Sequence, residues 1–130
     1  MNQRRPSWDD YFLNIAEQVS TRSTCNRAQV GVVVTDADHF IILTGYNGAP
    51  PGKPHCPPDE DLDPARPCRN ALHAEQNILM HAARRGVALK SATWYFWPFG
   101  PCDYCMRLVQ GTSPSGLIVP NNRQFYRRDL

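Results

Sequence analysis

Seven of the twelve prolines of this 130-residue chain lie in one stretch, between Asn47 and Pro67. Each proline lacks the backbone N–H that helices and sheets require, and each drives the preceding residue away from helical geometry. The same stretch carries two glycines and four acidic residues. It is therefore predicted to be a long, stiff loop, and regular structure is expected only on either side of it.

The residues before the loop show one helical pattern and two strand-like patterns. Apolar side chains recur at helical spacing over residues 8–21. Two β-branched runs, 29–35 and 40–46, flank the short polar connection 36–38, which suits a hairpin turn. We therefore expect a helix followed by two antiparallel strands.

Four further elements are predicted after the loop. Gly86 stands where a helix C-cap belongs, and Pro98 follows a run dense in aromatic residues, as it would after a buried strand. The patterns indicate a helix over 71–85, a strand over 92–97, a helix over 102–110 and a strand over 116–119. This order of helices and strands favours an α/β sandwich with a mixed sheet.

The length of 130 residues corresponds to about one domain, so residues 1–130 are expected to form a single unit. The last eleven residues, 120–130, hold three arginines and are too few for another strand-helix unit. We expect them to form a solvated basic tail.

Composition excludes several classes of function. A net charge of +2 is too small for a general binder of duplex nucleic acid. The longest apolar runs, 30–34 and 40–43, fall far short of the roughly 20 residues of a membrane span, and the amino terminus lacks the apolar core of a signal peptide. A cytoplasmic protein is therefore expected. In a reducing compartment, five cysteines are more typical of metal ligation or catalysis than of disulfides, and an odd number prevents complete pairing.

Two short motifs at predicted helix starts carry the chemistry. They are His73-Ala74-Glu75 and Pro101-Cys102-Asp103-Tyr104-Cys105. The three-residue spacing of the cysteines places both sulfurs on one helix face, and a helix N-terminus stabilises thiolates. One imidazole and two thiolates suit zinc and leave the fourth position for water, while Glu75 is the natural proton carrier. The pair of motifs matches the signature of zinc-dependent nucleobase deaminases. A structural zinc clip with a further protein ligand is the alternative that stays open.

The chain also resembles the deoxycytidylate (dCMP) deaminase family of the cytidine deaminase fold. The resemblance runs from residue 7 to about residue 119 and implies a three-layer α/β/α sandwich with a mixed sheet, shortened at its carboxyl end. The segments that carry it are Ser7-Trp8-Asp9-Asp10-Tyr11-Phe12, Arg22-Ser23-Thr24-Cys25-Asn26-Arg27, Gln29-Val30-Gly31, Gly45-Tyr46-Asn47-Gly48-Ala49-Pro50 and His73-Ala74-Glu75-Gln76-Asn77.

The resemblance implies an enzyme that hydrolyses dCMP to dUMP and ammonia. Zinc held by His73, Cys102 and Cys105 would activate water for attack on C4 of the base, and Glu75 would carry protons from the water to N3 and to the leaving amino group. The implied substrate-binding residues are Ser23, Thr24 and Arg27 at the phosphate, Asn47 at the sugar, and Ala74. Phe99, where the chain departs from the family pattern, is a further candidate for stacking on the base, and packing at the end of a buried strand is the alternative.

Regulation and a second zinc are also implied by the resemblance. Regulated family members bind the effectors dCTP and dTTP near the residues that match Tyr46, Gly48 and Pro50, within a homo-oligomer, either a hexamer or a dimer. Some members hold a structural zinc, for which Cys25, His55, Cys56 and Cys68 are the candidate ligands; buried free thiols are the alternative.

Two other functions stay open. One is a deaminase of another cytosine or adenine substrate, either a nucleoside or transfer RNA, and the other is a non-catalytic binding module stabilised by zinc. The aromatic stretch Trp97-Pro98-Phe99 before the second motif departs from the family pattern, so tolerance of a 5-substituted dCMP is a further hypothesis.

Overall fold

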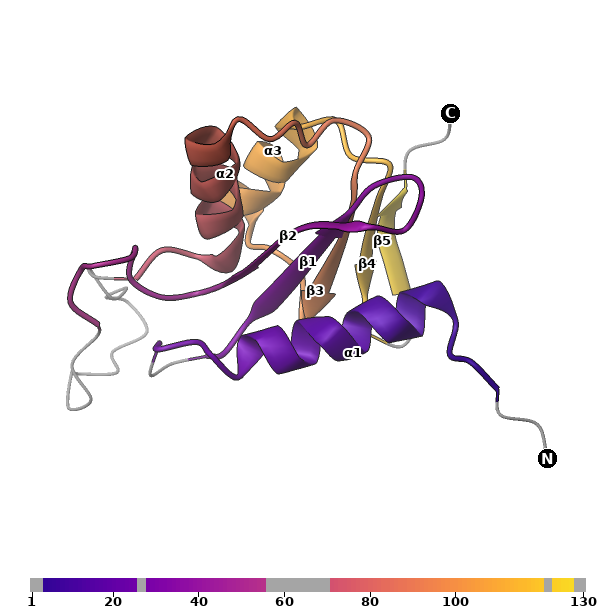
Figure 1. The fold of residues 1–130 in the computed structure, drawn as a ribbon, viewed down its shortest axis with the longest axis horizontal. Coiled ribbons are helices and arrows are strands. Elements are labelled where there is room, and N and C mark those ends of the chain that lie inside the picture. The colour runs from indigo at the N-terminus through magenta and orange to yellow at the C-terminus, as the bar shows by residue number, and fades with distance from the viewer. Residues whose placement is uncertain (1–3, 26–27, 56–70, 121–122, 128–130) are drawn as a thin grey trace.

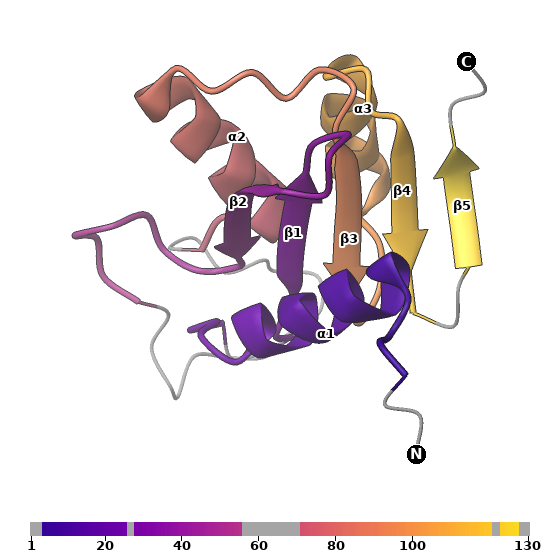
Figure 2. The same ribbon diagram turned by 45° about the vertical axis from the view of Figure 1, so that its right-hand side comes forward.

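The computed structural model describes residues 4–25, 28–55, 71–120 and 123–127, which form one five-stranded sheet with three helices. The sheet order is β2-β1-β3-β4-β5; β3 and β4 are parallel, and the other neighbours are antiparallel. Helix α1 lies against one face, and α2 and α3 lie against the other (Figures 1 and 2). The bounds are α1 Trp8–Ser20, β1 Gly31–Thr35, β2 Ile41–Tyr46, α2 Ala74–Arg85, β3 Thr93–Trp97, α3 Asp103–Gly111, β4 Gly116–Val119 and β5 Arg123–Arg127.

This arrangement confirms the predicted three-layer α/β/α sandwich with a mixed sheet. It also confirms the antiparallel hairpin of β1 and β2. Among the described residues, none of the helices is both long enough and apolar enough to cross a lipid bilayer.

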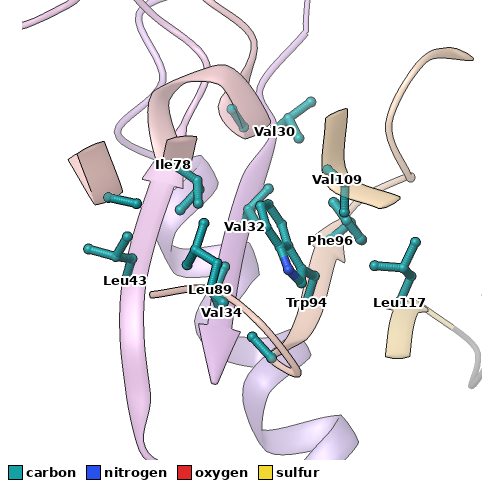
Figure 3. Packing of buried hydrophobic residues seen from close by; sticks show 13 residues of the cluster. Val30, Val32, Val34, Leu43, Ile78, Leu89, Trp94, Phe96, Val109 and Leu117 are labelled. Carbon is teal, nitrogen blue, oxygen red and sulfur yellow. The ribbon is translucent and has the colours of Figure 1, made fainter. Parts of the chain in front are cut away.

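Strand β1 is central because it contributes to the core on both faces of the sheet. Val32 and Val34 pack with Trp94 in the layer under α2 and α3, where Figure 3 shows their side chains together. Val33 points to the opposite face and packs with Phe12 of α1. Strands covered on both faces are continuously apolar rather than alternating, which explains the valine run.

Gly31 at the start of β1 allows α1 to approach the sheet closely. A Cβ atom at this position would overlap the backbone carbonyl oxygen of Ala16 and the backbone N of Ser20. Neither backbone atom can move without shifting α1, so only glycine fits here.

We expect Gly31→Ala to lower the free energy of unfolding by about 3 kcal/mol, at the upper end of the cost of overpacking, because α1 must shift. Gly111→Ala is the matched control: a Cβ atom added there would meet no atom within 4 Å, and alanine favours helix by roughly 0.5–1 kcal/mol. Urea denaturation of both variants tests this. Equal stabilities for the two variants would contradict the close approach.

Both motif-bearing helices begin later than the sequence patterns indicate. Helix α2 begins at Ala74 rather than at residue 71, because Leu72 is extended and exchanges two backbone hydrogen bonds of 3.0 and 2.9 Å with Gly48. His73 is therefore the N-cap residue, with φ −67° and ψ 156°. Cys102 is likewise the N-cap of α3 rather than a residue of its first turn.

The prediction of a solvated tail over 120–130 is wrong for Arg123–Arg127. These residues form β5, which pairs antiparallel with β4. The edge of β4 offers backbone N–H and C=O groups for pairing, and Phe125 and Tyr126 have high strand propensity. The prediction failed because the sequence does not show that β4 has an open edge.

Candidate active site

His73, Cys102 and Cys105 come together at the N-termini of α2 and α3. The Nδ1 atom of His73 lies 3.2 Å from Sγ of Cys105 and 3.7 Å from Sγ of Cys102. In a tetrahedral site with Zn–S distances of about 2.3 Å and Zn–N distances of about 2.0 Å, ligand atoms are about 3.6 Å apart. The three side chains therefore fit a zinc ion: among the described residues, their ligand atoms lie within 4.8 Å of one another, close enough to share one metal ion.

The local sequence explains how each ligand is held. Gln76 accepts a hydrogen bond of 2.8 Å from the backbone N–H of His73 through its side-chain oxygen, which fixes the start of α2. The sulfur of Cys102 accepts the backbone N–H of Cys105 at 3.5 Å. Such N–H groups and the helix dipole stabilise a thiolate at this position.

Glu75 is buried beside the ligands, with 3% of its surface exposed. Burial raises the pKa of its carboxyl group, while a hydrogen bond from its own backbone, the charge of His73 and a hydrogen bond from Cys105 act in the opposite direction. A carboxyl group with a raised pKa can bind and release a proton closer to neutral pH. This is the property that a proton carrier needs.

Cys105 is completely buried, and burial raises the pKa of its thiol to about 12, with further contributions from the charge of Glu75 and from Cys102. In the metal-free protein this thiol is therefore protonated at neutral pH. Metal binding must displace that proton.

Two of the ligands, His73 and Cys102, line a cavity of about 260 Å³, and Cys105 is buried behind it. Its polar lining includes His73, Glu75, Cys102 and Asn47, while Val30 and Phe99 are among its apolar lining residues. A mostly apolar pocket with a few convergent polar groups is the usual form of a small-molecule site.

The predicted substrate residues take different places around this cavity. Asn47, Ala74 and Phe99 line it, and Phe99 is 54% exposed. Ser23 is buried behind Asn47: its hydroxyl donates to the Asn47 carbonyl oxygen at 2.7 Å and accepts the backbone N–H of Cys25 at 3.2 Å. Thr24 packs against Gly48, and Arg27 lies outside the described residues.

The candidate ligands of a second zinc are only partly described. Cys25 lines the catalytic cavity, whereas His55 lines a separate cavity of about 360 Å³. Cys56 and Cys68 lie outside the described residues.

The candidate effector residues lie mainly around that separate cavity. Tyr46 and Pro50 line it together with Lys53 and His81. Gly48 instead pairs with Leu72, which lines the first cavity.

Sequence reasoning assigned no role to Asn77, although the structure shows a clear one. Its buried Nδ2 donates to the carbonyl oxygens of Tyr46, at 2.9 Å, and Gly48, at 3.2 Å. The sequence did contain one signal for this role. Asn77 is a polar residue one helical turn after His73, and it is buried next to the apolar Ile78 of α2.

Comparisons with known proteins agree with this site. Residues 6–119 match the family model described as "Cytidine and deoxycytidylate deaminase zinc-binding region". The deoxycytidylate deaminase of Mycobacterium phage D29 is 35% identical over 127 residues, which cover 89% of this chain and 96% of the phage protein. The deoxycytidylate deaminase of Saccharomyces cerevisiae is 38% identical over 133 residues, which cover 96% of this chain but 40% of the yeast protein.

The crystal structure of dCMP deaminase from the cyanophage S-TIM5, in complex with dCMP and dUMP, has a TM-score of 0.75 and 24% sequence identity. The match covers 90% of this chain and 83% of the cyanophage chain. At this level of identity the likeness establishes the fold.

Proposed function

The chain belongs to the cytidine and deoxycytidylate deaminase zinc-binding family, and on that premise we propose that it is an enzyme that hydrolyses dCMP to dUMP and ammonia. The observation that carries the proposal is that the buried Glu75 lines the same cavity as His73 and Cys102, which form a potential metal-binding group with Cys105. Proteins named deoxycytidylate deaminase that are 35–38% identical to this chain over the aligned residues support the choice of dCMP.

The reaction replaces the C4–N bond of cytosine by a C4–O bond and consumes one water molecule. Zinc, when bound, supplies the Lewis-acid activation that makes water nucleophilic near neutral pH. His73, Cys102 and Cys105 hold the metal in this proposal. Glu75 takes the proton of the water, delivers it to N3 of the base, and carries a second proton to the departing amino group, which leaves as ammonia.

We assign each part of the substrate to residues in or near the cavity wall. In the proposal Asn47 binds the sugar, Ala74 and Phe99 border the base, and Ser23, Thr24 and Arg27 serve the 5′-phosphate. The position of Asn47, Ala74 and Phe99 on one cavity with Glu75 supports the first two assignments. Because the Ser23 hydroxyl already has two partners, we assign most of the phosphate affinity to Arg27.

A substrate panel tests the proposed function. We expect deamination of dCMP with a kcat/KM at least ten times that for deoxycytidine, because hydrogen bonds to charged groups contribute about 1.5–3 kcal/mol. Arg27→Ala should lower the dCMP value by about tenfold or more and leave that for deoxycytidine unchanged. A preference for deoxycytidine would refute the phosphate assignment, and an inactive protein whose zinc is fully ligated by side chains would favour a binding module instead.

In the proposal, Phe99 determines whether the cavity admits a dCMP with a substituent at C5 of the base. Its ring borders the cavity and is half-exposed, so it can move to admit a methyl group. Including 5-methyl-dCMP in the panel, with wild type and Phe99→Ala, measures that tolerance directly.

We also propose that the second cavity binds dCTP and dTTP. Its lining combines Tyr46 with Lys53, His55 and His81, a set of donors that suits a triphosphate. Activity measured at low dCMP with and without each effector tests this, and His81→Ala should abolish the response to both effectors. An unchanged rate at millimolar effector in the wild type would contradict it.

A structural zinc held by Cys25, His55, Cys56 and Cys68 remains a proposal. It predicts two zinc ions per chain by elemental analysis, falling to one in Cys68→Ser with deamination retained. A wild-type protein with one zinc ion per chain would contradict the proposed structural zinc.

Residues 1–130 are proposed to act as a single domain within a homo-oligomer, either a dimer or a hexamer. The continuous sheet that includes every described strand supports the single domain. Light scattering of the purified protein measures the oligomer.

A further inference from the structure

Asn77 lines the second cavity, and its side chain bonds to the segment that carries Asn47, a residue of the catalytic cavity wall. We propose that Asn77 is a positioning residue for substrate binding: through the backbone of residues 46–48 it keeps Asn47 in the wall of the catalytic cavity. This inference rests on the proposed deamination of dCMP, and it assigns a role that neither motif contains.

The contacts of Asn77 bracket Asn47. The side-chain nitrogen of Asn77, a residue that is only 6% exposed, donates to the carbonyl oxygens of Tyr46 and Gly48. These carbonyl groups belong to the residues on either side of Asn47. One amide therefore fixes both neighbours of the substrate-binding residue.

Asn47 itself is also held by the residues that come just before β1. Its Oδ1 accepts the backbone N–H of Val30 at 2.8 Å, and its Nδ2 donates to the carbonyl oxygen of Ala28 at 2.6 Å. Its backbone carbonyl accepts the hydroxyl of Ser23 at 2.7 Å. These bonds fix the Asn47 side chain relative to residues 28–30, so a shift of the 46–48 backbone would draw the side chain away from these partners.

Helix α2 links this arrangement to the reacting groups. Asn77 is two residues after Glu75, and the backbone N–H of Asn77 donates to the carbonyl oxygen of His73 at 3.0 Å. The first turn of α2 thus carries the proposed zinc ligand, the proton carrier and Asn77, whose side chain bonds to both neighbours of Asn47. Asn77 thereby fixes the distance between the sugar-binding wall and the site of proton transfer.

The chemistry of the contact requires an amide. Two carbonyl oxygens accept from one group, so that group must supply two hydrogens, and a carboxylate would face both acceptors with its own lone pairs. Removal of the amide leaves the backbone bonds between Gly48 and Leu72 in place, so the segment loosens without detaching. We therefore expect weaker substrate binding rather than loss of the fold.

Steady-state kinetics with dCMP test the inference on zinc-loaded protein. Asn77→Ala should raise KM about tenfold, the effect of losing roughly one buried hydrogen bond, with kcat within about threefold of wild type and zinc content unchanged. Asn77→Asp should raise KM further. Asn14→Ala and Asn14→Asp, at an exposed position of α1, are matched controls and should leave KM unchanged.

A double-mutant cycle separates positioning from general stabilisation. If Asn77 acts through Asn47, then Asn77→Ala should change KM less than about twofold in the Asn47→Ala background. Additive effects on KM, or a lower Tm of Asn77→Ala with unchanged KM, would overturn the inference.

Hydrogen exchange gives a readout that does not depend on turnover. The backbone N–H of Val30 bonds to Asn47, so its exchange should be about tenfold faster in Asn77→Ala and unchanged in Asn14→Ala. If wild-type protein does not deaminate dCMP, the proposed function fails, and unchanged exchange at Val30 overturns the positioning role separately.

Discussion

Glu75→Gln is expected to reduce kcat for dCMP by on the order of 10⁴-fold, the upper end of the range for general acid–base catalysis. The large effect is expected because one carboxyl group serves both the proton removed from water and the protons delivered to the base. Glutamine has nearly the same shape but cannot accept and return a proton. Ammonia release in single-turnover experiments measures the loss.

The same variant should retain zinc and dCMP binding. Glu75 is not a ligand in the proposed site, so zinc per chain should equal that of wild type, and the Kd for dCMP should change by less than about tenfold. Glu17→Gln, at an exposed position of α1, is the matched control with full activity expected. Retained turnover in Glu75→Gln would refute the assigned role of Glu75, whereas loss of zinc would show that Glu75 supports the metal.

Local patterns were sufficient to predict every element of the sheet except the last. The β-branched runs of β1 and β2 indicate their strands, and the predicted β4 agrees with Gly116–Val119. These features depend on neighbours in the chain, so one sequence contains them. Strand β5 depends on the open edge of β4, which no local pattern reveals.

In the candidate site, too, the residues with a local sequence signal could be predicted, and those whose role depends on distant parts of the chain could not. His73, Glu75, Cys102 and Cys105 could be predicted because the chemistry of zinc restricts ligand type and spacing. The hydrogen bonds of Asn77 could not be predicted, because their acceptors are backbone carbonyl groups about 30 residues away. Every residue has a backbone carbonyl, so the sequence does not mark these acceptors. Gly31 was also missed as a packing residue, since its constraint comes from the backbone of α1 rather than from its own neighbours.

Zinc affinity is expected to depend strongly on pH, because the thiol of Cys105 must lose its proton when the metal binds. With the pKa of that thiol raised to about 12 by burial, it is protonated in the metal-free protein throughout the range from pH 6 to 8. Binding then releases this proton, so the apparent affinity falls about tenfold for each unit by which pH is lowered. Cys105 alone therefore predicts a loss of about 100-fold between pH 8 and pH 6.

Two measurements check this linkage. The first is competition with a chelator of known proton affinity, in which the loss of deamination reports removal of the catalytic zinc. A plot of the logarithm of the zinc affinity against pH should then have the predicted slope of about one per pH unit. Calorimetric titration of metal-free protein in buffers of different ionisation enthalpy should show at least one proton released for each zinc bound at pH 7. Glu17→Gln changes an exposed side chain of α1 that takes no part in the site and should leave the slope unchanged. An affinity that is constant from pH 6 to 8 would mean that Cys105 is already a thiolate before the metal arrives, and the helix N-terminus would then outweigh the burial of its sulfur.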